Sequence, residues 1–146
     1  FVGGREELAR WPRSDLLQFV HETRPCHGSL EGILPRLSDD DLREGVRIGA
    51  ANLYHAACHA YVHAKDVERP EALKGLYKAA SFVLQTLHCL DTGHYIERKD
   101  ALLQELSGIR REILTACLNR DAFTPSGEDA LFDLLIDWCG EVLRTI

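Results

Sequence analysis

The densest group of chemically capable side chains lies in residues 91–99, where a polar turn follows a long apolar segment. An ammonium group attracts phosphate as a point charge, a guanidinium can bind it through two hydrogen bonds, and a tyrosine ring offers a face for a base. This chemistry predicts a substrate or nucleotide contact, while a solvated loop between helices is the competing interpretation. The side chains concerned are His88, one helical turn upstream, and Thr92, His94, Tyr95, Arg98 and Lys99.

A second group follows a helical spacing: Asn52, His55, His59, His63 and Asp66 fall within an arc of about 80° at 100° per residue. Histidines four residues apart can supply two metal ligands from adjacent turns, or a surface that titrates near neutral pH. The solvent-facing strip of a buried helix and the wall of a polar pocket are the other interpretations. Because no His-Glu-x-x-His arrangement or paired cysteines complete a coordination set, we expect no metal site in this chain.

We expect this arc and the turn to form one cleft that binds the ligand. Lys78 lies about four helical turns before the end of its helix and would make a separate contact. No catalytic residue is predicted. The predicted substrate-binding residues are Asn52, His55, His59, Lys78, His88, Thr92, Tyr95, Arg98 and Lys99.

The elements that must position these groups are helices, because apolar residues recur at three- and four-residue steps and no segment alternates like a strand. Ser38 and Asp41 form a capping box that begins the strongest helix, and Gly93 ends the following helix as a C-cap. The fold class is therefore all-α, and we predict an up-and-down four-helix bundle with additional short helices. The four long helices are expected over residues 39–66, 71–92, 109–120 and 127–145, and the short ones over 14–23, elsewhere near the N-terminus, and over 99–106.

Residues 48–62 are apolar on nearly every side and rich in glycine and alanine, which predicts a central, closely packed helix. We interpret the chain as one domain, with short helices and a loop over residues 1–37 and the helical bundle over 38–146. The residues predicted to share one core are Leu53, Leu76, Val83, Leu87, Ile113, Leu134 and Trp138.

An ordered pattern of Tyr-Lys-Ala-Ala, Leu-His, Thr-Gly, Tyr, Lys and Leu-Leu crosses the middle of the chain. Its residues are Tyr77, Lys78, Ala79, Ala80, Leu87, His88, Thr92, Gly93, Tyr95, Lys99, Leu102 and Leu103. In this pattern the segment 41–118 resembles the helical substrate-binding domains that accompany nucleotidyltransferases, in the HEPN-like and kanamycin-nucleotidyltransferase-like group. The resemblance implies an all-α bundle that binds substrate beside a catalytic domain carrying Mg²⁺ and a nucleotide, in the same or a partner chain. One departure is Ser107-Gly108-Ile109-Arg110, where the family usually has an acidic turn.

Composition narrows the class of protein. A formal charge of −6 without a long Lys/Arg run argues against binding DNA, because phosphate backbones need a basic surface. Five cysteines without a Cys-x-x-Cys pair are typical of reduced thiols in a cytoplasmic protein. No apolar run is long enough to cross a bilayer, so we expect no membrane association.

These observations favour a non-catalytic substrate- or nucleotide-binding domain, with no cofactor of its own, that works with a nucleotidyltransferase domain. Nucleotidyl transfer needs paired carboxylates for Mg²⁺ beside a Gly-Ser loop, and the acidic run 39–41 is explained by helix capping. A HEPN-type ribonuclease is an alternative, but its motif is Arg, four to six intervening residues and then His, and the spacing in the nearest pairs, Arg47 with His55 and Arg13 with His21, is too long. A structural oligomerisation bundle is the other alternative, and in either role we expect a homo-oligomer.

Overall fold

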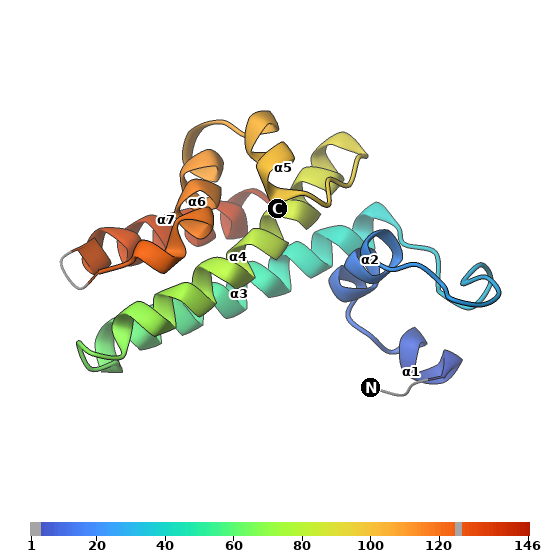
Figure 1. Ribbon diagram of the computed structural model, residues 1–146, viewed down its shortest axis with the longest axis horizontal. Coiled ribbons are helices and arrows are strands. Elements are labelled where there is room, and N and C mark those ends of the chain that lie inside the picture. The colour runs from blue at the N-terminus through green and yellow to red at the C-terminus, as the bar shows by residue number, and fades with distance from the viewer. Residues whose placement is uncertain (1–3, 125–126) are drawn as a thin grey trace.

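The computed structural model describes residues 4–124 and 127–146, and this part of the chain is helical, with no strand (Figure 1). The all-α prediction is confirmed. None of the described helices is both long and apolar enough to cross a membrane. The elements are α1 (Arg5–Ala9), α2 (Arg13–Glu22), α3 (Asp39–His63), α4 (Arg69–Thr92), α5 (Lys99–Glu105), α6 (Gly108–Leu118), the 3-10 turn η1 (Arg120–Ala122) and α7 (Glu128–Thr145).

The predicted capping box begins α3. The Ser38 hydroxyl accepts a hydrogen bond from the Asp41 backbone N–H at 3.2 Å, and the Asp41 carboxylate accepts one from the Ser38 N–H at 2.9 Å. The Ser38 hydroxyl also donates to the Asp41 carboxylate at 2.8 Å. The hydrogen bonds that this carboxylate accepts, first from the Ser38 backbone N–H and then from the hydroxyl, hold the pKa of Asp41 below its usual value. The helix ends at His63 rather than at residue 66, because Ala64 is already extended with ψ 136°.

The following helix, α4, ends where predicted. Gly93 has φ 74°, a left-handed conformation that glycine adopts at little cost, and its N–H donates to the carbonyl of Cys89 at 2.8 Å. The helix begins at Arg69, two residues before the predicted start, because Pro70 fits the first turn of a helix, where its missing N–H costs no hydrogen bond.

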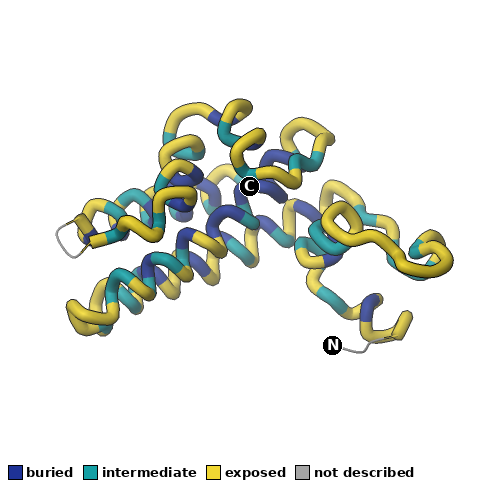
Figure 2. The backbone as a smooth tube through the Cα atoms, in the orientation of Figure 1, coloured by how far each residue is buried: buried dark blue, intermediate teal, exposed yellow. Residues whose placement is uncertain are grey.

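The central helix is α4, and the prediction that α3 is central is wrong. α4 packs against α2, α3, α6, α7 and η1 and holds the longest run of buried side chains, residues 84–89 (Figures 1 and 2). α3 packs against α2, α4 and α7 but leaves Ile48 52% exposed and Val62 68% exposed. An apolar helix therefore lies at the side of this structure with one face uncovered.

The predicted core is confirmed as one cluster, in which Leu53, Leu87, Ile113 and Trp138 are buried and Leu76, Val83 and Leu134 pack against them. Sequence analysis did not include Tyr77 and Phe132, which are both fully buried. The Tyr77 hydroxyl is satisfied because it donates to the carbonyl of Leu131 in α7 at 2.8 Å.

The N-terminal segment 4–37 consists of α1, α2 and a largely exposed loop. α2 packs on α3 and α4, and its Leu17 shares a small second cluster with Leu42 and Cys89. The segment is joined to the rest of the molecule mainly through α2, which places that helix beside both α3 and α4.

Candidate functional site

The turn after α4 is organised by Thr92. Its hydroxyl donates to the carbonyl of His88 at 2.7 Å and accepts from the His94 N–H at 3.2 Å. The His88 side chain is buried, at 8% exposure, within the last turns of α4. Thr92 therefore pairs with backbone groups at the end of the helix, and His88 is packed inside it. Neither side chain is an open ligand contact.

Tyr95 connects the turn to α2. Its hydroxyl donates to the carboxylate of Glu22, and its ring stacks on His21 with the centroids 4.5 Å apart and 14° between the planes. Burial, and then the hydrogen bond and charge of Glu22, raise the pKa of Tyr95 above the ordinary tyrosine value. The stacking surface predicted for a base is thus occupied on one side by a side chain of the protein.

The basic residues of the turn also have partners. Arg98 makes a bidentate ion pair with Asp100, with Nε 3.1 Å from Oδ1, and this pairing raises the pKa of Arg98 and lowers that of Asp100. The Lys99 ammonium lies 4.6 Å from the centroid of the Phe82 ring, within cation–π range. Both cations are held against neighbouring groups.

Sequence analysis missed the residue that fixes this turn from within. Gln85 is 1% exposed, and its Nε2 donates to the carbonyls of Ile96 and Glu97, both at 3.0 Å. Its Oε1 is buried and has no hydrogen-bond partner among the residues that the structure describes. The sequence contained a signal for this role, because a glutamine on the buried side of an apolar helix needs hydrogen-bond partners. The nearest irregular backbone that can supply them is the turn that follows.

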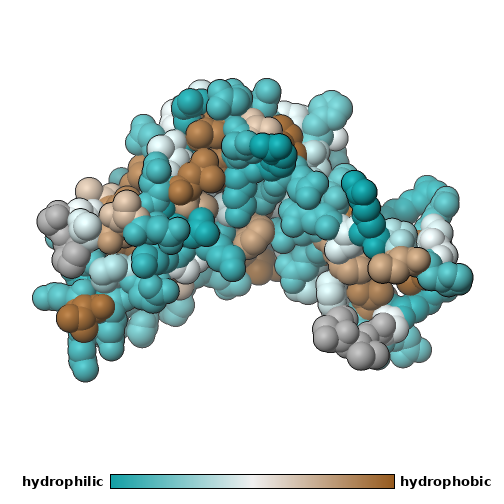
Figure 3. Space-filling model, in the orientation of Figure 1, coloured by the Kyte–Doolittle hydropathy of each residue, from teal (hydrophilic) through white to brown (hydrophobic). Residues whose placement is uncertain are grey.

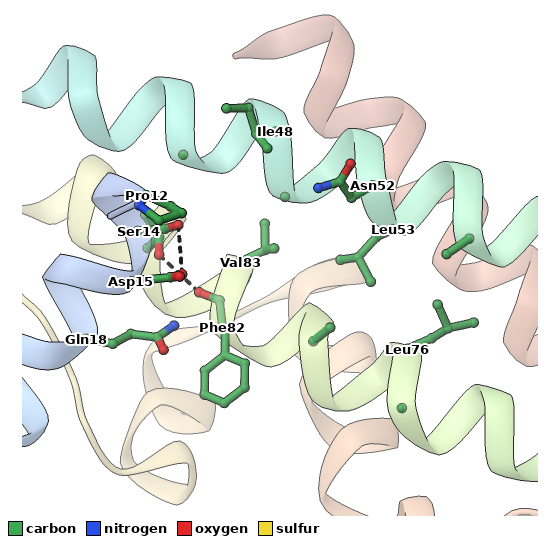
Figure 4. A pocket seen from close by; sticks show the side chains of 16 residues that line it. Pro12, Ser14, Asp15, Gln18, Ile48, Asn52, Leu53, Leu76, Phe82 and Val83 are labelled. Atoms are coloured by element: carbon green, nitrogen blue, oxygen red, sulfur yellow. Dashed lines mark hydrogen bonds between the residues drawn. The ribbon is translucent and has the colours of Figure 1, made fainter. Parts of the chain in front are cut away.

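An open groove lies elsewhere, where α2, α3 and α4 meet (Figure 4). Its volume is about 510 Å³, within the range of small-molecule sites. Its apolar lining includes Ile48 and Leu53 from α3 and Leu76, Phe82 and Val83 from α4. The groove is therefore bounded on two sides by the longest helices of the molecule.

Glycines set how closely these helices approach. A Cβ added at Gly49 would lie 2.7 Å from Cγ2 of Val83, and one added at Gly45 would lie 3.2 Å from Cβ of Ser14. A Cβ added at Gly75 would meet nothing within 4 Å. Gly45 and Gly49 are thus needed for packing around the groove, whereas Gly75 leaves space inside it.

One end of the groove is polar. Ser14, Asp15 and Gln18 of α2 lie there, and the Ser14 hydroxyl donates to Oδ1 of Asp15 at 3.4 Å, whereas Asn52 of α3 lies farther along the groove (Figure 4). Asp15 is exposed, and it is the one ionisable residue in the described lining. The groove consequently combines an apolar floor with hydrogen-bonding groups and a single negative charge.

The structure does not bring the predicted residues into one cleft. Because α3 and α4 are joined by a short connection and pack with Gly49 beside Val83, they run antiparallel. His59 then lies beside the first turns of α4, about 20 residues or roughly 30 Å from the turn at its other end. Only Asn52 of the predicted set lines the groove, and Lys99 reaches it indirectly through Phe82.

The remaining predicted residues are exposed. Lys78 is on the surface of α4, and His55 and His59 are on the surface of α3, outside the groove lining. The ring centroids of His59 and His63 are 4.7 Å apart, and those of His55 and His59 are 6.4 Å apart. Within residues 4–124 and 127–146, no group of three or more His, Cys, Asp or Glu side chains is arranged to hold a metal ion.

The chain matches no family model, no curated protein and no solved structure. Among the described residues, the groove offers what a ligand needs most directly, namely open volume, an apolar surface and polar groups at one end. The turn offers charges and rings that already serve the fold. Of the two regions, the groove is the better candidate for binding.

Proposed function

We propose that this protein is a non-catalytic helical module that binds a small acceptor substrate for a nucleotidyltransferase domain, in the same or a partner chain. The resemblance of residues 41–118 to nucleotidyltransferase-associated bundles and the groove between α2, α3 and α4 support the proposal. In this proposal α3, α4, α6 and α7 correspond to the four helices of an up-and-down bundle, and the contacts of α3 with α4 and α7 and of α4 with α6 are consistent with it.

The observation that carries the proposal is the lining of the groove. The apolar floor suits a ring or a hydrocarbon body, and Asn52, Gln18 and Ser14 can exchange hydrogen bonds with hydroxyl or amine groups. Asp15 attracts a cation and repels phosphate at that end of the groove. The acceptor is therefore expected to be neutral or cationic rather than a nucleotide.

The nucleotide and Mg²⁺ are expected on the catalytic domain. Nucleotidyl transfer uses at least two carboxylates to hold Mg²⁺, and the described lining of the groove contains one carboxylate, Asp15. Arg98 and Lys99 are proposed as outer contacts for phosphate, because both are cations at the end of α4 that an adjoining domain can approach. This role requires Arg98 to exchange Asp100 for the ligand.

The groove is tested by calorimetric titration with three probes of similar size: benzylamine, benzyl alcohol and benzoate. Binding is expected to be tightest for benzylamine and weakest for benzoate, and Asp15→Asn should remove the preference for the amine. Gly75→Phe should abolish binding of all three, because an added side chain at this position enters open space without a clash. Lys78→Ala, on the exposed surface of α4, is the matched control that should bind like the parent.

Equal affinity for benzylamine and benzoate, or unchanged binding in Gly75→Phe, would reject the groove as the acceptor site. The nucleotidyltransferase assignment is tested separately by sequence context. Coding sequence adjoining or neighbouring this chain should contain a Gly-Ser loop followed by paired aspartates on a predicted sheet. A context without such a segment would favour the second candidate, a structural oligomerisation bundle, which the exposed apolar residues of α3 also support.

A further inference from the structure

Most of one face of α3 serves neither the fold nor the proposed acceptor site, the exceptions being Asp41, which caps the helix, and Ile48, which lines the groove. At about 100° per residue its members share an arc of about 80°, opposite the buried side of the helix that contains Val46, Ala50 and Ala57. We name this surface the outer face of α3. It consists of Asp41, Glu44, Ile48, Ala51, His55, His59 and Val62.

The outer face is exposed along its length. Ile48 and Val62 are 52% and 68% exposed, Ala51, His55 and His59 are exposed, and only Asp41 is partly covered. Ile48 also contributes to the groove, but the other members of the face do not line it. Uncovered branched apolar side chains on a long helix are typical of a surface that packs against another protein.

The molecule as a whole exposes more surface than a compact monomer needs. Its accessible surface is 8,986 Å², whereas a compact monomer of 16.4 kDa is expected to expose about 7,500 Å². The arched outline in Figure 3 is consistent with this surplus. The surplus of about 1,500 Å² is larger than the roughly 800 Å² that each partner buries in a standard protein interface. The exposed loop of segment 4–37 contributes to this total, so the outer face of α3 is identified by its exposed side chains and not by the surplus.

The order of residues along the outer face indicates the partner. Acidic residues lie at its N-terminal end, Ile48 and Ala51 in the middle, and the imidazoles of His55 and His59, followed by Val62, at its C-terminal end. Ala51 is the midpoint of α3 (Asp39–His63). If two copies of the face pack antiparallel about an axis near Ala51, Glu44 of each copy lies opposite His59 of the other. A parallel arrangement would place Glu44 against Glu44.

The antiparallel arrangement satisfies the polar ends of the face while it buries the apolar middle. An imidazole N–H can donate a hydrogen bond to a carboxylate, so His59 of one copy and Glu44 of the other are complementary partners. Ile48 would lie near His55 of the second copy, and both would be removed from water. Such a self-complementary patch is the requirement for a two-fold dimer.

We propose that this protein forms a homodimer in which the outer face of α3 packs antiparallel against the same face of a second copy. The inference goes beyond the proposed function, because it requires neither a ligand nor a catalytic domain. Sedimentation equilibrium at increasing protein concentration should give a species of twice the 16.4 kDa chain mass. Ile48→Glu should raise the dissociation constant of the dimer about tenfold or more, since it places two carboxylates inside the interface.

Val67→Glu is the matched control. Val67 is 85% exposed and lies in the connection between α3 and α4, off the outer face, so this variant should dimerise like the parent. Both variants should keep the helical circular dichroism and melting temperature of the parent monomer. A parent chain that stays monomeric at every concentration, or an Ile48→Glu variant that dimerises as the parent does, would overturn the proposal.

The antiparallel register has its own test. His59→Glu should weaken the dimer, because it sets a carboxylate against Glu44 of the second copy, and adding Glu44→Lys to the same chain should restore it. Within one chain, residues 44 and 59 are separated by about 22 Å of helix, so they cannot compensate each other directly. Recovery in the double variant supports the antiparallel dimer, and a double variant as weak as His59→Glu alone contradicts it. His59 does not line the groove, so His59→Glu should lose the dimer while it binds the groove probes like the parent, and this result would support the dimer independently of the proposed function.

Discussion

The turn after α4 and the groove between α2, α3 and α4 differ in how many chemically capable residues they contain and in how open they are to a ligand. The turn has histidine, tyrosine, arginine and lysine within a few residues, yet Tyr95, Arg98 and Lys99 all contact other side chains of the protein. The groove is lined largely by glycine, alanine and aliphatic residues, yet it is the open region. Reactive residue types at high density can therefore serve the fold, while a binding surface can arise where side chains are small.

The largest effect is expected from the turn. Tyr95→Ala removes both the ring that stacks on His21 and the hydroxyl that binds Glu22. We expect it to lower the free energy of unfolding by about 3 kcal/mol, because a half-buried aromatic contact between α2 and the end of α4 is lost. Urea denaturation followed by circular dichroism measures this change. Lys78 is exposed on α4, the helix that precedes the turn, so Lys78→Ala should change the free energy of unfolding by no more than about 0.5 kcal/mol. A Tyr95→Ala variant as stable as the parent would contradict the structural role of Tyr95 and favour its predicted role in ligand binding.

The next effect concerns the helix spacing beside the groove. In Gly49→Ala the added methyl group would lie 2.7 Å from Val83 Cγ2. Either α3 and α4 separate or Val83 changes rotamer, and we expect a loss of about 2 kcal/mol in the free energy of unfolding. Thermal denaturation measures the loss, and Gly49→Ala combined with Val83→Ala should recover part of it. If the single variant is neutral, close approach at Gly49 is not what defines the groove.

Alkaline pH should weaken the fold through two tyrosines. Burial raises the pKa of Tyr77, and burial with Glu22 raises that of Tyr95, so the folded protein favours the protonated phenols. Their contribution is complete below the ordinary tyrosine pKa near 10 and is lost as the pH rises further, by about 1.4 kcal/mol per pH unit for Tyr77 and less for the partly exposed Tyr95. Denaturant midpoints measured between pH 8 and pH 11 test this slope, and Tyr95→Phe should make the slope shallower. A midpoint that rises with pH would have the wrong sign for both groups.

The smallest effect has the opposite sign. Gly75→Ala adds a methyl group to the middle of α4, where nothing lies within 4 Å. Since glycine inside a helix costs about 0.5 to 1 kcal/mol relative to alanine, the variant should be more stable by that amount. The comparison with Gly49→Ala is direct, because both substitutions add one methyl group beside the same groove. A destabilised Gly75→Ala variant would show that the groove is closed in solution.

The parts of the fold that sequence analysis predicted depend on residues close together in the chain. The capping box needs Ser38 and Asp41, three residues apart, and the end of α4 needs Gly93 alone, so both were available from local chemistry. The core positions followed from helical periodicity: Leu53, Leu87, Ile113 and Trp138 are buried, and Leu76, Val83 and Leu134 are partly buried against them. Tyr77 and Phe132 were not predicted as core residues, because periodicity does not specify which side of the apolar stripe packs against a second helix.

The groove and the uncovered side of α3 depend on contacts between distant residues. The close approach of Gly49 to Val83 and of Gly45 to Ser14 has no signature in a local window. An apolar sequence such as residues 48–62 indicates that the helix is to be covered, but it does not distinguish burial inside the chain from an uncovered side. The predicted cleft failed for a related reason, since the antiparallel pairing of α3 and α4 separates His59 from the turn by the length of a helix.

The bond between Tyr95 and Glu22 also has a consequence for the order of assembly during synthesis. The two residues are 73 positions apart, so α2 leaves the ribosome about 4 to 15 s before Tyr95 is available, at ordinary rates of translation. During that interval α2 can pack on α3, but the hydrogen bond from Tyr95 to Glu22 cannot yet form. The wall of the groove that carries Asp15 is consequently among the later parts of the nascent chain to reach its final position.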